Sequence, residues 1–310
     1  MTRTAIPPSP GDRPCALATA GGAWWLDPRA RPLVRAGMVL LASGLLHLPV
    51  WAIRGGGWEG PLAWRKPILF GISAGLTTLS LGWIFAALPR HRRDGVVAML
   101  TAWAIVLEVA LIDLQTWRGV ASHFNRATPF DSALYDAMGA LILAVTATAV
   151  LLTVRCFRTP LAWPADMRLA ARAGLVCLLV SAGIGVWSTV YGDTRLAAGL
   201  APEIYGRAGV TKFPHGAVIH ALQWLPAVAW LARRAGQPTA TRYRLVALAT
   251  CGTACLGSYS LAQMLLGRGR LDATPATAVV LGAGAAALAW PLLAILLTAL
   301  TRGGGGDAPA

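Results

Sequence analysis

The chain has 310 residues, of which 56% are apolar and only 13% are charged, and its mean hydropathy is +0.58. Soluble domains carry about a quarter charged residues, so this composition excludes an ordinary soluble domain. The net charge of +14 lies mainly in short turns between long apolar runs, where basic residues set membrane topology, so nucleic acid is not an expected partner. We therefore expect an all-α, polytopic transmembrane helix bundle that contacts the lipid bilayer.

Eight apolar segments of spanning length follow one another along the chain. Residues 1–31 are rich in Pro, Gly and Arg, which predicts a disordered cytoplasmic tail, and residues 301–310 form a second, Gly-rich tail. The bundle between them, residues 32–300, is predicted to span the membrane over residues 33–53, 64–88, 95–117, 132–157, 170–191, 213–231, 243–266 and 275–300.

The basic residues indicate how the bundle is oriented. With both termini in the cytoplasm, 17 of the 27 lysines and arginines fall in cytoplasmic segments. The outer connectors, which begin near Arg54, Arg118, Gly192 and Gly267, are longer in total and hold the rest. The positive-inside rule therefore predicts a multi-pass protein of a bacterial inner membrane with cytoplasmic N and C termini. None of the five cysteines falls in an outer connector, so a disulfide framework is not expected.

The two lysines of the chain occupy similar places in its two halves, residues 32–157 and 168–300. Lys66 and Lys212 each lie at the outer start of a span, close to a proline, a phenylalanine and a glycine. This similarity is consistent with a parallel repeat of four plus four spans. A lysine at this depth either extends toward the lipid headgroups or faces an anionic group in an outer cavity.

The densest polar motif is residues 211–223, at the start of the sixth span. It contains Lys212, His215, His220 and Gln223. In a regular helix, His215 and His220 are about 140° apart and cannot chelate one ion, whereas His220 and Gln223 share a face. We expect Lys212 and His215 at the mouth of the site, and His220 and Gln223 directed toward His47 and Glu108.

The third span carries a second polar group. Glu108, Gln115 and Arg118 fall on one helix face, together with Ser122 in the following connector. Glu108 lies about 15 Å below the outer end, near the middle of the membrane. An ionised carboxylate there costs several kcal/mol unless it is paired or protonated. Glu108 is therefore either a neutral acid in an interhelical hydrogen bond or a proton-relay, ion-pair or ligand-site residue.

Four histidines, His47, His123, His215 and His220, map to the outer half of the bundle. His47 and His220 are each about 9 Å below the outer end of a span, and two histidines at one depth suit haem b or a transition metal. Each histidine can equally serve in packing or hydrogen bonding. A hydrolase pair of Ser122 and His123 is not expected, because adjacent side chains rarely point at each other.

In length, span number and outward histidines, the chain resembles the haem A synthases, eight-span proteins made of two four-helix halves. The resemblance is architectural only. Glu108 and Arg118 have no histidine between them, unlike the glutamate and arginine signatures of that family, and its outer cysteine pair is missing. No residue role is transferred from it.

These patterns predict one outward-opening polar site between the first, second, third and sixth spans. The expected side chains are His47, Lys66, Glu108, Gln115, Arg118, His123, Lys212, His215, His220 and Gln223. A haem- or metal-binding redox protein is the first interpretation, with His47 and His220 as ligands. A transporter of a small anionic or proton-coupled solute is the second, although the cytoplasmic halves of the spans look nearly free of polar residues. A non-catalytic membrane assembly or sensor protein is the third.

Overall fold

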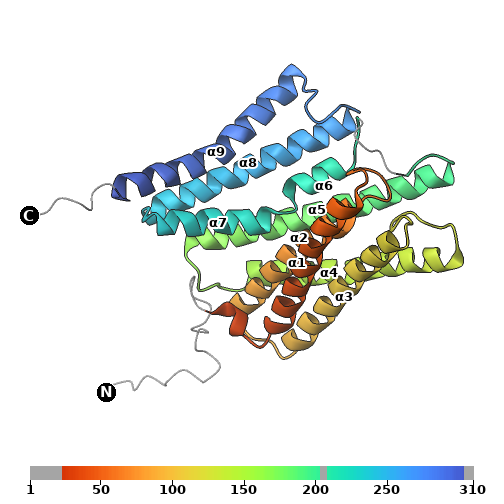
Figure 1. Cartoon of the computed structure of the whole chain (residues 1–310). Coiled ribbons are helices and arrows are strands. Elements are labelled where there is room, and N and C mark those ends of the chain that lie inside the picture. Colours follow the sequence, from red (N-terminus) through yellow and green to blue (C-terminus); the bar gives the residue numbers. More distant parts are fainter. Residues whose placement is uncertain (1–22, 203–207, 304–310) are drawn as a thin grey trace, which may run out of the picture.

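The computed structural model describes residues 23–202 and 208–303. Within these residues the secondary structure is entirely helical (Figure 1). The helices are η2 (Trp24–Leu26), α1 (Arg31–Arg54), α2 (Arg65–Ala87), α3 (Asp94–Trp117), α4 (Pro129–Arg158), α5 (Ala165–Ala197), α6 (Lys212–Val218), α7 (Ala221–Arg234), α8 (Thr239–Leu265) and α9 (Pro275–Gly303).

Seven of these helices, all except α6 and α7 and the short η2, are long and apolar enough to cross a membrane. Large apolar side chains such as Trp103 of α3 and Trp290 of α9 are exposed on the surface of the bundle. Such side chains are stable there only in contact with lipid. The chain is therefore a multi-pass membrane protein, and the predicted helical bundle is confirmed.

The sixth predicted span differs from a regular helix. It is divided into α6 and α7, and Ile219 and His220 lie in a turn between them. The carbonyl oxygen of His220 accepts bonds from the backbone N–H groups of Gln223 and Trp224, at 3.0 and 3.1 Å, and so begins α7. The prediction of one continuous helix over residues 213–231 was wrong. Discontinuous helices in membranes place backbone and polar side chains at the level of a buried site.

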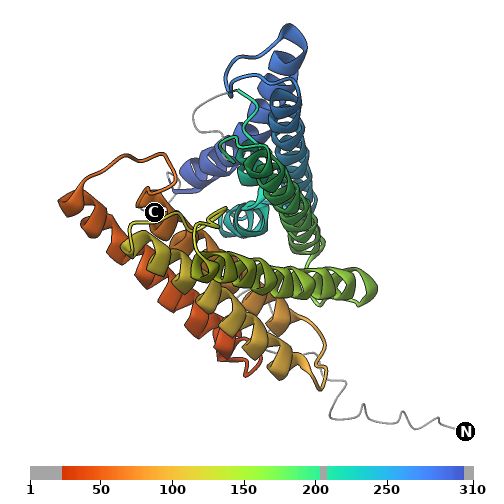
Figure 2. The same ribbon diagram turned by 90° about the vertical axis from the view of Figure 1, so that its right-hand side faces the viewer.

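The helices form two groups, α1–α4 and α5–α9, which Figure 2 shows inclined to each other. In the first group α1 and α2 pack with their backbones in contact: a Cβ atom on Gly71 would lie 2.6 Å from Cα of Gly44. In the second group Gly174 of α5 is equally close to α7, since a Cβ there would lie 2.5 Å from Cα of Leu222. Small residues allow this approach, which holds helices together in a bilayer by dispersion.

Two ends of the bundle are defined by its turns. The arginine-rich end comprises the start of α1, the α2–α3, α4–α5 and α7–α8 turns and the end of α9, on the left of Figure 1. The connector end comprises the longer segments at residues 55–64, 118–128, 198–211 and 266–274, of which residues 203–207 lie outside the described part.

The N-terminal segment is more ordered than its composition predicts. Residues 1–22 of the predicted tail, and residues 304–310 at the other end, lie outside the described residues. Residues 23–30, however, are packed, and Asp27 is fully buried. Arg29 donates to Asp27 at 2.9 Å and to the carbonyl oxygen of Leu88 at 2.9 Å, beside the end of α2. The predicted tail therefore extends too far, because an ion pair caps a helix end there.

Candidate functional site

The site is built around the connector at residues 118–128, which Asp131 holds in place. Its Oδ1 atom accepts hydrogen bonds from Arg118 Nη1 at 2.7 Å and Gln115 Nε2 at 3.0 Å. Its Oδ2 atom accepts from the hydroxyl of Thr128 at 2.7 Å, and the backbone N–H of Asp131 donates to that hydroxyl at 3.1 Å. The predicted residues Gln115 and Arg118 thus support the connector. Asp131 was missed, although Thr128 and Asp131 have the spacing of a helix-capping pair.

Ser122 and His123 lie inside this connector. Ser122 is 1% exposed, and its Oγ atom is 3.0 Å from Nδ1 of His123, contrary to the expectation that adjacent side chains do not meet. The tight connector, and not a helix, sets this geometry. The imidazole also packs against Phe70 of α2 and Tyr135 of α4, with ring centroids 5.7 and 6.2 Å apart.

The residue after His123 has a strained backbone. Phe124 has φ of 57°, the only positive value of a non-glycine residue in the described part of the chain. Its ring occupies a notch in α5 at Gly192, where a Cβ atom would lie 2.4 Å from Cε1 of Phe124. Such strain persists only where the surroundings enforce it, and it is common at functional sites. The notch couples the position of His123 to α5.

Both lysines of the chain lie near His123. Burial, and then the positive charges of Lys66 and Lys212, lower the pKa of His123 from 6.5 to about 3. The imidazole is therefore neutral at physiological pH. It lies deep in the protein, yet part of its surface remains accessible, as expected for a side chain that lines an opening. Lys66, at the start of α2, is only 6% exposed. The structure thus brings together three of the predicted site residues, Lys66, His123 and Lys212.

His47 lies in a different environment. Its Nε2 atom accepts a hydrogen bond from the indole N–H of Trp117 at 3.0 Å, so its Nδ1 atom carries the proton and donates to the carbonyl oxygen of Ser43 at 2.8 Å. Ser43 also donates to Oδ2 of Asp113 at 3.0 Å. Both ring nitrogens of His47 are therefore occupied at the α1–α3 interface.

The histidines of the broken helix hold helices together. Nε2 of His220 is 3.1 Å from Oγ of Ser73 in α2, and its Nδ1 atom is 3.2 Å from Oε1 of Gln223. Gln223 itself donates to Ser80 of α2 at 2.9 Å. His220 and Gln223 thus face α2, whereas the helical pattern directed them toward His47 and Glu108. The break between α6 and α7 changes the direction that a continuous helix would have given them.

His215 lies in α6 and faces α5. Its Nδ1 atom is 2.9 Å from the carbonyl oxygen of Ser181, and the hydroxyl of Ser181 donates to the carbonyl oxygen of His215 at 3.0 Å. The structure therefore gives His47, His123, His215 and His220 separate hydrogen-bond partners. Among the residues that it describes, no group of three or more His, Cys, Asp or Glu side chains is arranged to hold a metal ion.

Glu108 is 3% exposed and makes no hydrogen bond or ion pair with any described residue. The nearest charged group is Asp113, whose Oδ1 atom is also buried without a partner. Toward the arginine-rich end, Thr101 and Thr148 are buried and their hydroxyls are 2.8 Å apart. The expectation that these halves of the spans are nearly free of polar residues was therefore wrong, since single threonines hardly change the hydropathy of a span.

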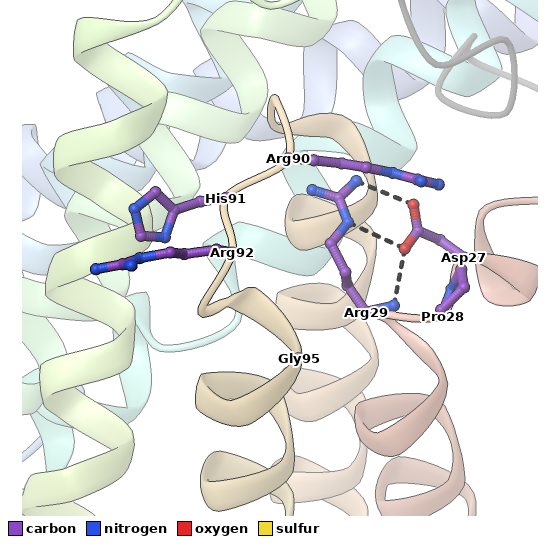
Figure 3. A pocket seen from close by; sticks show the side chains of 7 residues that line it. All are labelled: Asp27, Pro28, Arg29, Arg90, His91, Arg92 and Gly95. Atoms are coloured by element: carbon purple, nitrogen blue, oxygen red, sulfur yellow. Dashed lines mark hydrogen bonds and ion pairs between the residues drawn. The ribbon is translucent and has the colours of Figure 1, made fainter. Parts of the chain in front are cut away.

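A pocket of about 360 Å³ lies at the arginine-rich end (Figure 3). Asp27, Pro28, Arg29, Arg90, His91, Arg92 and Gly95 line it. Burial opposes ionisation of Asp27, but the hydrogen bonds and charge of Arg29 outweigh it and hold the pKa of this carboxyl below its usual value. The pocket is thus bordered by a fixed ion pair and by side chains of the α2–α3 turn.

With this geometry the chain is a multi-pass membrane protein of a bacterial type, and comparisons with known proteins bear on its class. A segment of 60 residues is 45% identical to an H-type subunit (H 1) of the NADH-quinone oxidoreductase of Rhodopseudomonas palustris (strain BisA53), and covers 19% of this chain and 18% of that protein. A segment of 59 residues is 39% identical to an H-type subunit (H 2) of the same enzyme in Cereibacter sphaeroides (strain ATCC 17023) and covers the same shares. The similarity therefore spans less than a fifth of each relative. No protein-family profile and no solved structure matches the chain.

Proposed function

We propose that this protein binds a small anionic ligand at an outward-facing site between Lys66, His123 and Lys212, in a bacterial inner membrane. The observation that carries the proposal is the convergence of the only two lysines of the chain on one buried, neutral imidazole. The excess of arginines in the turns of the opposite end supports an outward orientation of the site.

The physical chemistry of the three side chains favours an anion. Two ammonium groups close to one another repel, and an anion between them removes this repulsion. A charge about 4 Å from one ammonium gains about 4 kcal/mol at an effective dielectric constant of 20. The neutral imidazole of His123 offers a further hydrogen bond, and the rings of Phe70 and Tyr135 restrict the size of the ligand.

The proposal is tested with purified protein in detergent, by thermal unfolding in the presence of chloride, phosphate, sulfate and small carboxylates. We expect saturable stabilisation by at least one of these anions and an affinity at least tenfold lower in Lys66→Met and Lys212→Met. Arg65→Met is the matched control, because it removes a neighbouring positive charge at the same helix start. Equal affinities in all variants, or no stabilisation by any anion, would refute the proposal.

A redox-type membrane protein is a second candidate, favoured by the similarity to the NADH-quinone oxidoreductase subunits. Haem b or a transition metal at His47 and His220 is the corresponding cofactor hypothesis. Ligation through Nε2 would require His47 to release Trp117 and His220 to release Ser73. An absorption spectrum and a metal determination on the purified protein test it. A Soret band lost in His47→Ala or His220→Ala would support haem, whereas colourless, metal-free protein would eliminate this candidate.

A further inference from the structure

A buried polar side chain recurs at every seventh position of α3 and of the connector after it. The five residues are Asp94, Thr101, Glu108, Gln115 and Ser122, and none is more than 3% exposed. Seven residues make about two helical turns, so the four helical members face the same direction. We call this set the α3 stripe. It extends from the arginine-rich end to the connector that holds His123.

Four members of the α3 stripe have a side-chain partner. These contacts are Asp94–Arg155 at 2.5 Å, Thr101–Thr148 at 2.8 Å, Gln115–Asp131 at 3.0 Å and Ser122–His123 at 3.0 Å. Glu108, the middle member, makes no hydrogen bond or ion pair within the described part of the chain. A stripe that only fixed the packing of α3 on α4 would pair its central member or replace it with an apolar one. A buried carboxyl without a partner costs several kcal/mol and is typical of a functional position.

Each end of the α3 stripe reaches a place where protons can enter or leave. At the arginine-rich end, the pocket in Figure 3 is lined by Gly95, the residue after Asp94, and by His91, whose backbone N–H donates to Asp94 at 3.0 Å. At the connector end, the α3 stripe stops at Ser122 and the partly accessible imidazole of His123. Glu108 is the ionisable member of the stripe between these ends.

We infer that the α3 stripe is a proton route through the membrane, with Glu108 as its central carrier. Glu108 takes up one proton on a carboxyl oxygen from one side and releases one to the other, so it alternates between acid and carboxylate. Successive members are about 10 Å apart along the helix axis, a gap that transient waters can bridge. The inference extends the proposed function, and rests on it in one respect: an anion that moves with a proton carries no net charge across the membrane.

The neighbours of Glu108 support a proton carrier instead of an ion pair. On α3 itself the nearest charged group is Asp113, and on α1 the nearest titratable group is His47, which interacts with Asp113. Among the described residues, α2 and α4 contribute no charge at this level, and the carboxylate of Asp131 in α4 is paired with Arg118 at 2.7 Å. Within this part of the chain, no cation is therefore placed to hold Glu108 permanently ionised.

The test uses the full-length protein in liposomes that enclose a pH-sensitive dye, with a potassium diffusion potential set by valinomycin. We expect potential-driven proton flux that falls at least tenfold in Glu108→Gln. Glu59→Gln, the same change at an exposed connector residue, is the matched control and should conduct like the wild type. Thr101→Val should lower the flux, whereas Thr146→Val, whose hydroxyl donates only to the carbonyl oxygen of Ile142 within α4, should not. Wild-type protein without flux, or equal flux in Glu108→Gln, would overturn the inference.

Two further measurements separate this inference from the proposed function. Glu108→Gln should retain anion-dependent stabilisation while it loses proton flux, and Lys66→Met should show the reverse. If Glu108→Gln does not fold, a hydrophobic carbodiimide applied to wild-type protein replaces it. Modification of Glu108, found by mass spectrometry together with loss of flux, supports the route. Flux that continues after Glu108 is fully modified, or Glu108 left unmodified under conditions that abolish flux, contradicts it.

Discussion

The arginine-rich end and the interior of the bundle treat buried ionisable groups differently. At the arginine-rich end, Asp94 is paired with Arg29 at 3.2 Å and Arg155 at 2.5 Å, and Asp166 is paired with Arg242 at 3.0 Å. In the interior, Glu108 has no cationic partner among the described residues, and the charges that act on His123 are those of two lysines.

The difference separates architecture from chemistry. Asp94 and Asp166 lie in the first turns of α3 and α5, where the helix dipole favours a negative charge and the arginines of neighbouring turns reach them. These pairs connect adjacent helix ends. Glu108 and His123 lack such compensation, so their protonation states respond to a ligand or to a proton. Three changes in stability test whether the contrast is real.

The largest effect is expected from Asp94→Ala, which leaves Arg29 and Arg155 buried without their partner. Removal of one member of a buried ion pair costs about 3 kcal/mol or more in the free energy of unfolding. Asp136→Ala is the control, since Asp136 pairs with Arg126 at 2.9 Å on an exposed surface. Exposed pairs contribute less than about 1 kcal/mol. Reversible unfolding in mixed micelles measures both, and equal losses would contradict the assigned role of the buried pair.

A smaller effect is expected from pH at His123. Because its folded pKa is about 3, the unfolded chain binds a proton below about pH 6.5 that the folded protein does not. The contribution of His123 is therefore favourable above pH 6.5 and is lost as the pH falls toward 3, by about 2 kcal/mol between pH 8 and pH 5.

His123→Asn should remove this part of the acid destabilisation, measured as the free energy of unfolding at pH 8 and at pH 5. His91→Asn, at an exposed position in the α2–α3 turn, should leave the pH dependence of the wild type. If His123→Asn also leaves it unchanged, the imidazole is not held neutral by its surroundings.

The smallest effect, and one of opposite sign, is expected from Glu108→Met. This change replaces a buried carboxyl without a partner by an apolar side chain of similar size, so stability should rise by about 1 kcal/mol. Unfolding in mixed micelles at pH 7 provides the measurement. A loss as large as that of Asp94→Ala would mean that Glu108 has a structural partner, and the contrast between the two regions would disappear.

Much of the bundle could be predicted from hydropathy, because each span is a local property of about 20 residues. The predicted spans over residues 33–53, 64–88 and 95–117 correspond to α1, α2 and α3. The division of the sixth span at Ile219 and His220 could not be predicted in this way, since both halves remain apolar. It depends on contacts of His220 and Gln223 with Ser73 and Ser80 of α2.

The candidate site was partly predictable. Lys66, Lys212 and Glu108 stand out in the sequence because charged residues are rare in apolar spans. The seven-residue spacing of the α3 stripe was also present in the sequence, but Thr101 carries no charge and gives no signal until its burial against Thr148 is known. The meeting of Ser122 with His123 depended on the connector that Asp131 holds.

The sequence by itself therefore determined the class of protein, the positions of most spans and the rarity of its charges, because transfer of apolar segments into a bilayer is a local, additive property. Only the tertiary structure decided which polar side chains meet. It brought Lys66 and Lys212 to His123, gave His47 and His220 separate partners, and left Glu108 without one among the described residues. Those outcomes depend on which helices are neighbours, and helix packing in a membrane is set by close contacts between residues far apart in the chain.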